Sequence, residues 1–324
     1  MKQAKFKAII LAGGSGERFW PLSTPERPKQ FLRIFGGESL IRQSVSRLKG
    51  LVDPKDVFVI TSRALVATTR RELPEVPRTN IVGEPMRRDT GAAVALGTAL
   101  AGEGTLGFFS SDQLVADPVR FRRTVREAIR VARRSASIVT IGIRPEYPAT
   151  GFGYVDPQTG AFVEKPDARK AKAYLKRGYL WNAGMFIGRS ETFRSAFAAH
   201  APALVKLFST PVSRLASVYP DLPRISFDFA VMEKLDGVKV VPGDFGWDDV
   251  GSYSAFDKYF QHDARGNVRE GPVNVVEADG NICVARAAQI ALLGVKDLVV
   301  VTTPNAVLVA DKSRIAEMKK LFVK

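Results

Sequence analysis

The sequence predicts an α/β protein: a doubly wound, mostly parallel sheet of the Rossmann-like kind, followed by a small C-terminal β domain. Short apolar runs alternate with helical patterns over the first 150 residues, as they do in βαβ units. The first apolar run passes directly into a glycine-rich loop, and open α/β sheets bind nucleotides at such a place. From residue 266 onward, valine-rich segments are separated by closely spaced Gly, Asn and Pro turns, which indicates short strands.

Hydrophobic periodicity locates the elements of the first domain. Residues 8–11 form a continuous apolar run, which is typical of a buried parallel strand. Further apolar runs predict more strands, and apolar residues at helical spacing predict the helices between them. The predicted strands are 8–11, 57–60, 80–84, 105–109 and 137–142, and the predicted helices are 39–49, 64–72, 90–101 and 120–134.

The pattern changes after residue 150. Segments 152–155 and 161–164 flank the turn-rich stretch Asp156-Pro-Gln-Thr-Gly160 and predict a hairpin. The segments expected to return the chain to the sheet are 180–186, 226–234 and 238–241.

The C-terminal part begins at a boundary within residues 260–265. We therefore expect a catalytic domain of residues 1–262 and a β domain of residues 263–324, which ends in a helix at 313–322. Short strands at close spacing favour a solenoid of few coils, although the period is too loose to establish one.

Composition limits the class of protein. The 324 residues contain one cysteine, Cys283, which excludes an internal disulfide and fits a reducing, cytoplasmic location. No apolar run approaches the ~20 residues that span a bilayer, and we expect no signal peptide because only a short stretch precedes the first strand. We therefore expect no membrane partner.

The net charge of +15 raises the question of nucleic-acid binding. The densest basic segment, residues 120–134, has apolar residues at helical spacing, which leaves its arginines on the other face. Aromatic residues suited to base stacking are absent from that basic face. We therefore expect a solvated helix face and no nucleic-acid partner.

The loop after the first predicted strand is suited to binding phosphate. Gly13, Gly14 and Gly16 have no Cβ, so they can adopt positive φ angles and let backbone N–H groups close on an oxyanion. Ser15 adds a hydroxyl group. A strand followed by this loop and by basic residues predicts a phosphate site rather than an ordinary turn.

Two basic residues follow the glycines. Arg18 offers a planar fork of donors, and Lys29 offers a mobile point charge. The Walker pattern fails because Gly16 is followed by Glu17 and Arg18 instead of Lys and Ser/Thr. The dinucleotide pattern fails because position 19 is Phe19, and because the second strand is not followed by an acid.

The stretches Leu11-Ala-Gly-Gly-Ser-Gly-Glu-Arg-Phe-Trp-Pro-Leu22 and Pro28-Lys-Gln-Phe31 resemble the loop of the sugar-nucleotide pyrophosphorylases. The tryptophan and the Pro-Lys-Gln-Phe run are similar to the mannose-1-phosphate guanylyltransferase branch of that family. The resemblance implies a nucleotidyltransferase-type sheet and a C-terminal domain that is a short left-handed β-helix. It also implies that Leu11 and the loop from Gly13 to Gly16 bind the nucleotide.

Two acidic positions are candidates for metal binding. Asp112 follows a predicted strand, at the edge of the sheet where active sites lie. Asp248 and Asp249 are adjacent, so at most one of them is expected to share a metal with Asp112. The resemblance aligns Trp247-x-Asp249-x-Gly251 with a family motif and implies that Asp112 and Asp249 hold Mg²⁺, which prefers hard oxygen ligands.

A second set of residues is expected to hold a sugar phosphate. Glu164 and Lys165 belong to a Glu-Lys-Pro motif, in which the lysine can neutralise a phosphate and the carboxylate can accept sugar hydroxyls. Gly153 lies in the upstream stretch Thr150-Gly-Phe-Gly-Tyr154, and Asn182 can pair with hydroxyls on the sugar ring.

The resemblance implies that the nucleotide base lies against the stretch from Glu84 to Gly91, which follows the third predicted strand. A carboxylate can accept hydrogen bonds from both the N1–H and the exocyclic amine of guanine. The resemblance implies that Glu84, Arg88 and Thr90 bind the nucleotide, while Asp89 departs from the Asn that is commoner in the family.

Together these residues predict an enzyme that transfers GMP from GTP to α-D-mannose 1-phosphate, giving GDP-mannose and pyrophosphate. Arg18 and Lys29 would steady the triphosphate, Lys165 the sugar phosphate, and Asp112 and Asp249 the metal. The alternatives are another pair, such as glucose 1-phosphate with UTP or dTTP, and a regulatory nucleotide-sugar binder without catalysis. The C-terminal segment, residues 266–324, is expected to shape either a dimer or a lid over the active site and to contribute no chemical group, and the expected assembly is a homodimer.

Overall fold

The computed structural model describes residues 5–14 and 16–322. Ser15, which was predicted to bind the nucleotide, lies outside the described residues. The strands of the first part are β1 (Phe6–Ala12), β2 (Val57–Ser62), β3 (Ile81–Glu84), β4 (Thr105–Ser110), β5 (Leu114–Val115), β6 (Val139–Ile143), β7 (Tyr154–Val155), β8 (Phe162–Val163), β9 (Leu180–Arg189), β10 (Lys239–Gly243) and β11 (Trp247–Asp248). The α-helices are α1 (Leu40–Ser46), α2 (Val66–Glu72), α3 (Asp89–Ala101), α4 (Pro118–Arg134), α5 (Ala168–Lys176), α6 (Ser190–His200), α7 (Leu215–Val218), α8 (Phe227–Ala230) and α9 (Ala255–Tyr259).

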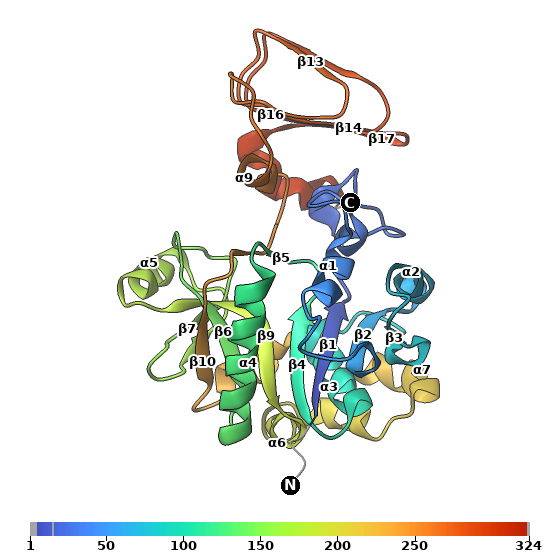
Figure 1. Cartoon of the computed structure of the whole chain (residues 1–324), viewed down its shortest axis with the longest axis vertical. Coiled ribbons are helices and arrows are strands. Elements are labelled where there is room, and N and C mark those ends of the chain that lie inside the picture. The colour runs from blue at the N-terminus through green and yellow to red at the C-terminus, as the bar shows by residue number, and fades with distance from the viewer. Residues whose placement is uncertain (1–4, 15, 323–324) are drawn as a thin grey trace. The chain divides into compact units, whose positions relative to one another are not determined.

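The main sheet has the order β10-β6-β9-β4-β1-β2-β3 (Figure 1). β1 pairs in parallel with both β2 and β4, β2 pairs in parallel with β3, and β6 pairs in parallel with β10. β9 is antiparallel to both of its neighbours, β4 and β6. The mostly parallel sheet that the sequence predicts is therefore confirmed, with β9 reversed inside it.

Helices cover both faces of this sheet. Phe108 and Phe109 are neighbours in β4, so their side chains point to opposite faces. The Phe108 ring contacts Phe193 of α6, and the Phe109 ring contacts Phe121 of α4. The two helices therefore lie on opposite faces, as a doubly wound sheet requires.

Local sequence explains the two longest helices. Asp117 caps α4 by accepting hydrogen bonds from the backbone N–H groups of Val119 and Arg120, both at 2.9 Å. α3 is rich in small residues and almost wholly buried. A Cβ at Gly97 would come within 2.8 Å of Ile9 in β1, so the glycine lets α3 approach the sheet closely.

The predicted hairpin is confirmed, because β7 pairs antiparallel with β8. Helices α5 to α9 were not predicted, and α8 lies in the segment 226–234 that was expected to return the chain to the sheet. The predicted C-terminal helix is a 3₁₀ helix, Lys312–Phe322. Its buried residues Ile315 and Met318 are three positions apart, the spacing that aligns side chains on one face of a 3₁₀ helix.

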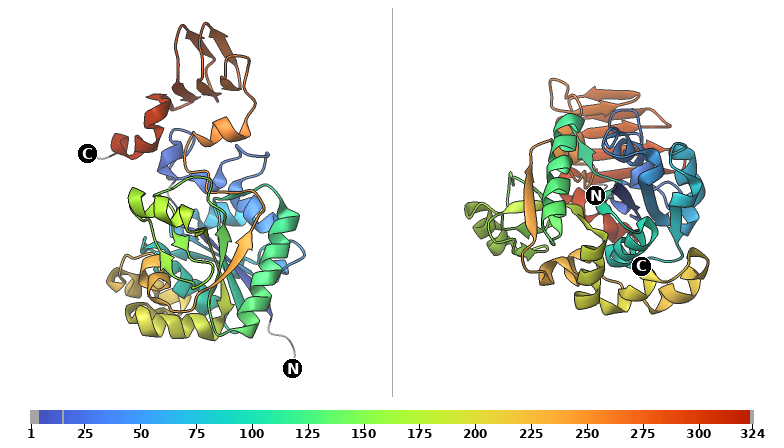
Figure 2. Two further views of the ribbon diagram at one scale, coloured as in Figure 1. Left: turned by 90° about the vertical axis from the view of Figure 1, so that its left-hand side faces the viewer. Right: turned by 60° about the horizontal axis from the view of Figure 1, so that its bottom comes forward.

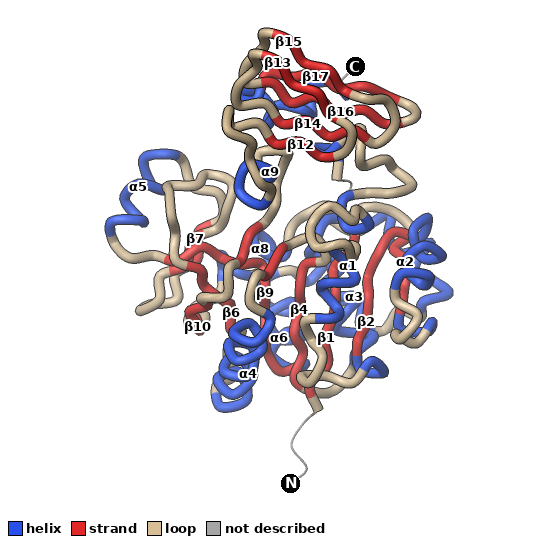
Figure 3. Tube along the Cα trace, turned by 45° about the horizontal axis from the view of Figure 1, so that its top comes forward, coloured by secondary structure: helices blue, strands red, loops and turns tan. Residues whose placement is uncertain are grey.

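The C-terminal strands are β12 (Val268–Glu270), β13 (Val273–Val276), β14 (Ile282–Ala285), β15 (Ile290–Leu293), β16 (Leu298–Thr303) and β17 (Ala306–Asp311). β12, β14 and β16 pair in parallel, β13 pairs in parallel with β15, and β17 closes the stack antiparallel to β16. Figures 2 and 3 show these strands one above another. This is the arrangement of a short β-helix-like domain, as expected.

The chain divides into two compact units that do not follow chain order. One contains residues 1–13 and 41–248, and the other contains residues 14–40 and 249–324. The second half of the glycine loop thus belongs with the C-terminal strands. The predicted division of the chain at residue 262 stays a prediction. In the part of the chain that the structure describes, no helix is long and apolar enough to cross a membrane.

Candidate active site

Within the first unit, the carboxyl ends of β1, β3 and β4 meet at one edge of the sheet, because these strands are parallel. The backbone N–H of Ser111, at the end of β4, donates to the carbonyl of Leu11 at 3.1 Å. A Cβ at Gly13 would lie 3.6 Å from the Glu84 carboxylate. The structure therefore brings together Leu11, Gly13, Glu84 and the turn that carries Asp112.

Glu84 is held in a buried position. Its side chain accepts a hydrogen bond from the Tyr219 hydroxyl at 3.1 Å, and the residue is only 8% exposed. Burial raises the pKa of the Glu84 carboxyl to about 7, although the bond from Tyr219 acts in the opposite direction. Near neutral pH the carboxyl is therefore divided between its protonated and ionised forms.

Arg88 and Thr90 anchor another segment to the start of α3. Arg88 donates to the backbone carbonyls of Tyr219 and Pro220, at 2.8 and 2.5 Å. The Thr90 hydroxyl accepts a hydrogen bond from the backbone N–H of Phe227 at 2.8 Å. Both residues thus fix the 219–228 segment in place, and their predicted contact with a nucleotide stays a prediction.

The four residues predicted to hold a sugar phosphate lie together in the first unit. Lys165 forms an ion pair with Glu164, with its Nζ 2.5 Å from a carboxylate oxygen. The backbone N–H of Asn182 donates to the Gly153 carbonyl at 2.8 Å. A Cβ at Gly153 would come within 2.5 Å of the Glu164 carboxylate, so this glycine makes room for that side chain.

The charges of this cluster are strongly coupled. Burial acts to lower the pKa of Lys165, but the hydrogen bond and the negative charge of Glu164 outweigh it, and the net pKa is raised. The ammonium group, which is half exposed, therefore stays protonated. The pair presents a fixed positive charge next to a buried hydrogen-bond acceptor.

Sequence reasoning missed Asp228, which belongs to the same cluster. Its side chain accepts a hydrogen bond from the Asn182 amide at 3.0 Å, and the Asn182 oxygen accepts one from the Thr140 hydroxyl at 2.8 Å. Burial, followed by the negative charge of Glu164, raises the pKa of Asp228 to about 7. No local motif marks this residue, which lies in the one-turn helix α8. Only the packing of α8 brings it to the site.

The second unit holds the remaining predicted residues. Gly16 has a φ of 65°, and a Cβ there would come within 2.3 Å of the Lys29 backbone nitrogen, so the glycine loop closes onto the Pro-Lys-Gln-Phe stretch. The Gln30 side-chain amide donates to the Gly14 carbonyl at 3.4 Å.

Arg18, Lys29 and Asp249 meet in this unit. Lys29 donates to the backbone carbonyl of Asp249 at 2.6 Å. The backbone of Gly251 lies close to the side chains of both Arg18 and Asp249. A Cβ at this glycine would be 3.2 Å from the Arg18 guanidinium and 3.6 Å from the Asp249 carboxylate. The expectation that Lys29 is mobile was wrong. Its side chain is buried and fixed, because an ammonium group removed from water must be hydrogen-bonded.

The adjacent aspartates differ in their surroundings. Asp248 lies in β11 and pairs with Leu114 of β5 in the first unit, whereas Asp249 begins the final stretch of the second unit. Among the described residues there is no group of three or more Asp, Glu, His or Cys side chains that could hold a metal. Two carboxylates suit Mg²⁺, because it binds one or two of them together with substrate phosphates. Joint metal binding by Asp112 and Asp249 stays a prediction.

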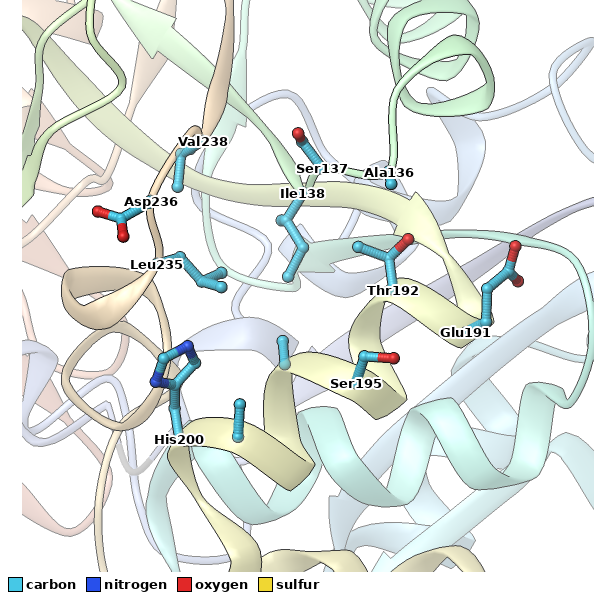
Figure 4. A pocket seen from close by; sticks show the side chains of 12 residues that line it. Ala136, Ser137, Ile138, Glu191, Thr192, Ser195, His200, Leu235, Asp236 and Val238 are labelled. Carbon is cyan, nitrogen blue, oxygen red and sulfur yellow. The ribbon is translucent and has the colours of Figure 1, made fainter.

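A cavity of about 360 Å³ lies elsewhere in the first unit (Figure 4). It is lined by residues at the start of β6 and along α6, among them Ile138, Glu191, Ser195 and His200. None of the predicted site residues lines it. The parallel strand β6 begins here, so this cavity is not at the carboxyl edge where the predicted residues gather.

Comparison with known proteins agrees with this geometry. The family model described as nucleotidyl transferase matches residues 7–266, and a model described as a MannoseP isomerase/GMP-like beta-helix domain matches residues 271–324. A mannose-1-phosphate guanylyltransferase of Escherichia coli strain K12 is 34% identical over 99% of this chain and 73% of its own length. The chain belongs to the mannose-1-phosphate guanylyltransferase family.

Solved structures extend the comparison. The structure of a protein named mannose-1-phosphate geranyltransferase, from Thermus thermophilus, superposes with a TM-score of 0.88 at 35% identity and covers 98% of both chains. A putative glucose-1-phosphate thymidylyltransferase from Bacillus anthracis, at 19% identity and a TM-score of 0.52, shares the fold over 78% of this chain. Members of the guanylyltransferase family are nucleotidyltransferases, and this chain is one of them.

Proposed function

We propose that this protein transfers GMP from GTP to α-D-mannose 1-phosphate, releasing pyrophosphate. The observation that carries the proposal is the cluster of Gly153, Glu164, Lys165, Asn182 and Asp228 inside one compact unit. It combines one exposed cation with acceptors for hydroxyl groups, which is what a sugar monophosphate needs. The names of the relatives that match along this chain favour mannose and guanine as the sugar and the base.

In the proposed reaction, a phosphate oxygen of the sugar phosphate attacks the α-phosphorus of GTP. A new P–O bond forms as the bond from the α-phosphorus to the bridging oxygen breaks, and pyrophosphate leaves with that electron pair. No general base is needed, because a phosphate monoester is largely ionised near neutral pH. The work of the protein is positioning and charge neutralisation.

The residues of the site have distinct roles in this reaction. Lys165 holds the attacking phosphate, and Glu164 with Asn182 and Asp228 orients the sugar. Arg18 binds the triphosphate. Lys29 holds the backbone at Asp249 and adds positive charge beside the phosphates. Mg²⁺, when bound by Asp112 and Asp249, supplies charge neutralisation at the reacting phosphates.

The test is a grid of the four nucleoside triphosphates against mannose, glucose and galactose 1-phosphates, with released pyrophosphate as the signal. We expect GTP with mannose 1-phosphate to give the highest kcat/KM. A maximum for UTP or dTTP with glucose 1-phosphate would replace this proposal by the alternative pyrophosphorylase. Binding of GDP-mannose without turnover of any pair would instead identify a regulatory nucleotide-sugar binder. The homodimer stays a prediction, which the mass of the protein in solution would test.

A further inference from the structure

Arg47 is a buried cation for which the proposed reaction has no direct use. It follows α1, and the residue is only 4% exposed. Taking a guanidinium out of water is costly unless hydrogen bonds and nearby charges compensate it. Its Nε has no hydrogen-bond partner among the described residues, so compensation is incomplete. A buried charge that is only partly compensated needs an explanation.

The other two guanidinium nitrogens of Arg47 both donate to the turn at residues 110–113. Nη1 donates to the Gln113 carbonyl at 2.9 Å, and Nη2 donates to the Ser110 carbonyl at 3.1 Å. These two carbonyls lie on either side of Asp112 in the chain. The guanidinium thus spans the turn from end to end, which a planar fork can do and a single ammonium group cannot.

Neighbouring contacts complete the support of this turn. The Ser44 hydroxyl, from α1, donates to the same Ser110 carbonyl at 3.2 Å. The Ser110 hydroxyl in turn donates to the Asp112 carboxylate. The Gln113 side chain donates to the Ala183 carbonyl in β9 at 2.9 Å. The path from Arg47 to the Asp112 carboxylate is therefore a short chain of hydrogen bonds.

Electrostatics supports the same connection. Burial lowers the pKa of Arg47 to about 10, and the negative charge of Asp112 opposes that change. The guanidinium remains protonated at neutral pH and lies within electrostatic range of the Asp112 carboxylate. The ring of Phe121 in α4 is 5.3 Å from the guanidinium carbon and helps to keep it in place.

We propose that Arg47 is a positioning residue for Asp112: by holding the carbonyls of Ser110 and Gln113, it fixes the turn in the conformation that presents the Asp112 carboxylate to a divalent cation. This inference rests on the proposed function, in which Asp112 is a metal ligand. A ligand that is held in one orientation loses less conformational freedom when the metal binds. Loosening the turn should therefore weaken the binding of the metal more than the binding of either substrate.

The test compares Arg47→Lys and Arg47→Met with the control Arg42→Met. Arg42 lies in α1 and donates to a backbone carbonyl outside the turn, that of Glu72. We expect both Arg47 variants to raise the Mg²⁺ concentration for half-maximal rate about tenfold or more, with little change in the KM for mannose 1-phosphate. Arg42→Met should leave both quantities as in the wild type.

A second measurement does not depend on turnover. Amide hydrogen exchange at residues 111–114 should become faster in the Arg47 variants, and Mn²⁺ binding followed by electron paramagnetic resonance should weaken. If Arg47→Met does not fold, the metal requirement and the hydrogen exchange of Arg47→Lys still test the positioning role. Unchanged metal requirement, exchange and Mn²⁺ binding in Arg47→Lys would overturn the proposal.

Asp112→Asn separates this inference from the proposed function. We expect it to lose turnover and Mn²⁺ binding without faster exchange in the turn. If Asp112→Asn kept full turnover and metal binding, the assignment of Asp112 as a metal ligand would fail, and the role of Arg47 toward it would fail with it. If Asp112→Asn lost both while Arg47→Lys behaved as Arg42→Met, only the positioning role would be wrong.

Discussion

At the scale of single residues, the site depends on carboxyl groups held in contrasting surroundings. Glu164 forms an ion pair with Lys165, whereas burial raises the pKa of Glu84 and that of Asp228 to about 7. A buried carboxyl with a raised pKa can donate as well as accept a hydrogen bond near neutral pH. The roles of these groups therefore depend on pH as well as on position.

Lys165→Ala should raise the KM for mannose 1-phosphate by on the order of 100-fold, with a much smaller effect on the KM for GTP. A charged donor to phosphate is worth a few kcal/mol, and Glu164 would be left without its cation. Steady-state kinetics with each substrate varied in turn measures the two effects. Lys172→Ala, on the exposed side of α5, is the control. A selective rise in the KM for GTP would instead show that Lys165 binds the triphosphate.

Asp249→Asn should lower kcat at least about 100-fold, whereas Asp248→Asn should stay within tenfold of the wild type. Loss of a metal ligand removes several kcal/mol of charge stabilisation, and only Asp249 matches the metal position of the family motif. Asp248 instead extends the β5–β11 ladder through its backbone, which the substitution preserves. Equal losses in both variants, measured by pyrophosphate release, would remove the basis for choosing between them.

Glu84→Gln should flatten the dependence of stability on pH. The folded-state pKa of Glu84 is raised from 4.5 to about 7, so the folded protein binds this proton more tightly than the unfolded chain does. Its contribution to stability is therefore complete below about pH 4.5 and is lost as the pH rises through about 7. Glutamine is neutral throughout and can still accept the Tyr219 hydrogen bond.

The measurement for Glu84 is the melting temperature at pH 5.5 and pH 8 in the wild type and the variant. Between these two pH values we expect the free energy of unfolding of the wild type to fall by about 1–3 kcal/mol more than that of Glu84→Gln. Glu26→Gln changes an exposed carboxylate and is the control. The same slope in wild type and Glu84→Gln would show that Glu84 does not titrate in this window.

At the scale of elements, α4 explains part of the large positive charge. Arg122 and Arg126 donate to the backbone carbonyls of Arg47 and Gly50, and Arg133 donates to the Thr105 hydroxyl. These arginines tie the helix to the loop after α1 and to the start of β4. The basic face of α4 thus has a structural use, and the expectation of no nucleic-acid partner stays a prediction.

The C-terminal coils have an internal support that sequence reasoning did not find. Asn267 and Asn281 are fully buried at equivalent places in successive coils. The Asn267 oxygen accepts hydrogen bonds from the backbone and the side chain of Asn281, and the Asn281 oxygen accepts one from the Leu298 backbone. The repeated Gly-Asn pairs at 266–267 and 280–281 were the available signal.

Asn281→Ala should destabilise these coils by about 2 kcal/mol or more, because it removes a buried side chain and leaves the partly buried Leu298 N–H without its acceptor. Local stability is best followed by amide hydrogen exchange, and we expect β14 and β16 to exchange roughly 30-fold faster. Asn274→Ala changes an exposed asparagine of β13 and should have little effect. Unchanged exchange in Asn281→Ala would mean that the ladder is not needed for the stack.

At the scale of the whole molecule, segments far apart in the sequence form one compact unit. The glycine-loop residues from 14 onward and the C-terminal strands belong together. The Trp20 ring meets the Phe322 ring edge-on, with centroids 5.8 Å apart, and the Tyr253 hydroxyl donates to the Phe19 carbonyl at 2.9 Å. Residues 249–324 therefore support the loop that carries Arg18 and Lys29. That residues 266–324 contribute no chemical group stays a prediction.

Phe322→Ala should raise the KM for GTP about 2- to 10-fold, since an aromatic pair contributes about 0.5–1.5 kcal/mol to holding the loop. The KM for mannose 1-phosphate should change little, because its proposed residues lie in the other unit. Leu321→Ala removes an exposed apolar side chain next in sequence and is the matched control. The same KM for GTP in both variants would show that the Trp20–Phe322 contact does not contribute to GTP binding.

The sequence by itself determined the features that are written in short stretches of chain. The alternation of apolar runs with helical patterns was enough to predict the main sheet, because burial of a parallel strand demands a continuous apolar run. Glu164 and Lys165 are adjacent in the chain, and the glycines directly follow a strand, so local patterns were enough to nominate them.

Only the tertiary structure decided what depends on residues far apart in the chain. Asp228 joins the sugar-phosphate cluster because α8 packs there, 46 positions after Asn182, and no local pattern marks it. Arg47 meets the Asp112 turn across more than 60 residues. Lys29 is buried rather than mobile because its amine meets the Asp249 carbonyl, 220 positions away. Such contacts follow from how the elements pack, and packing is a property of the whole fold rather than of any one segment.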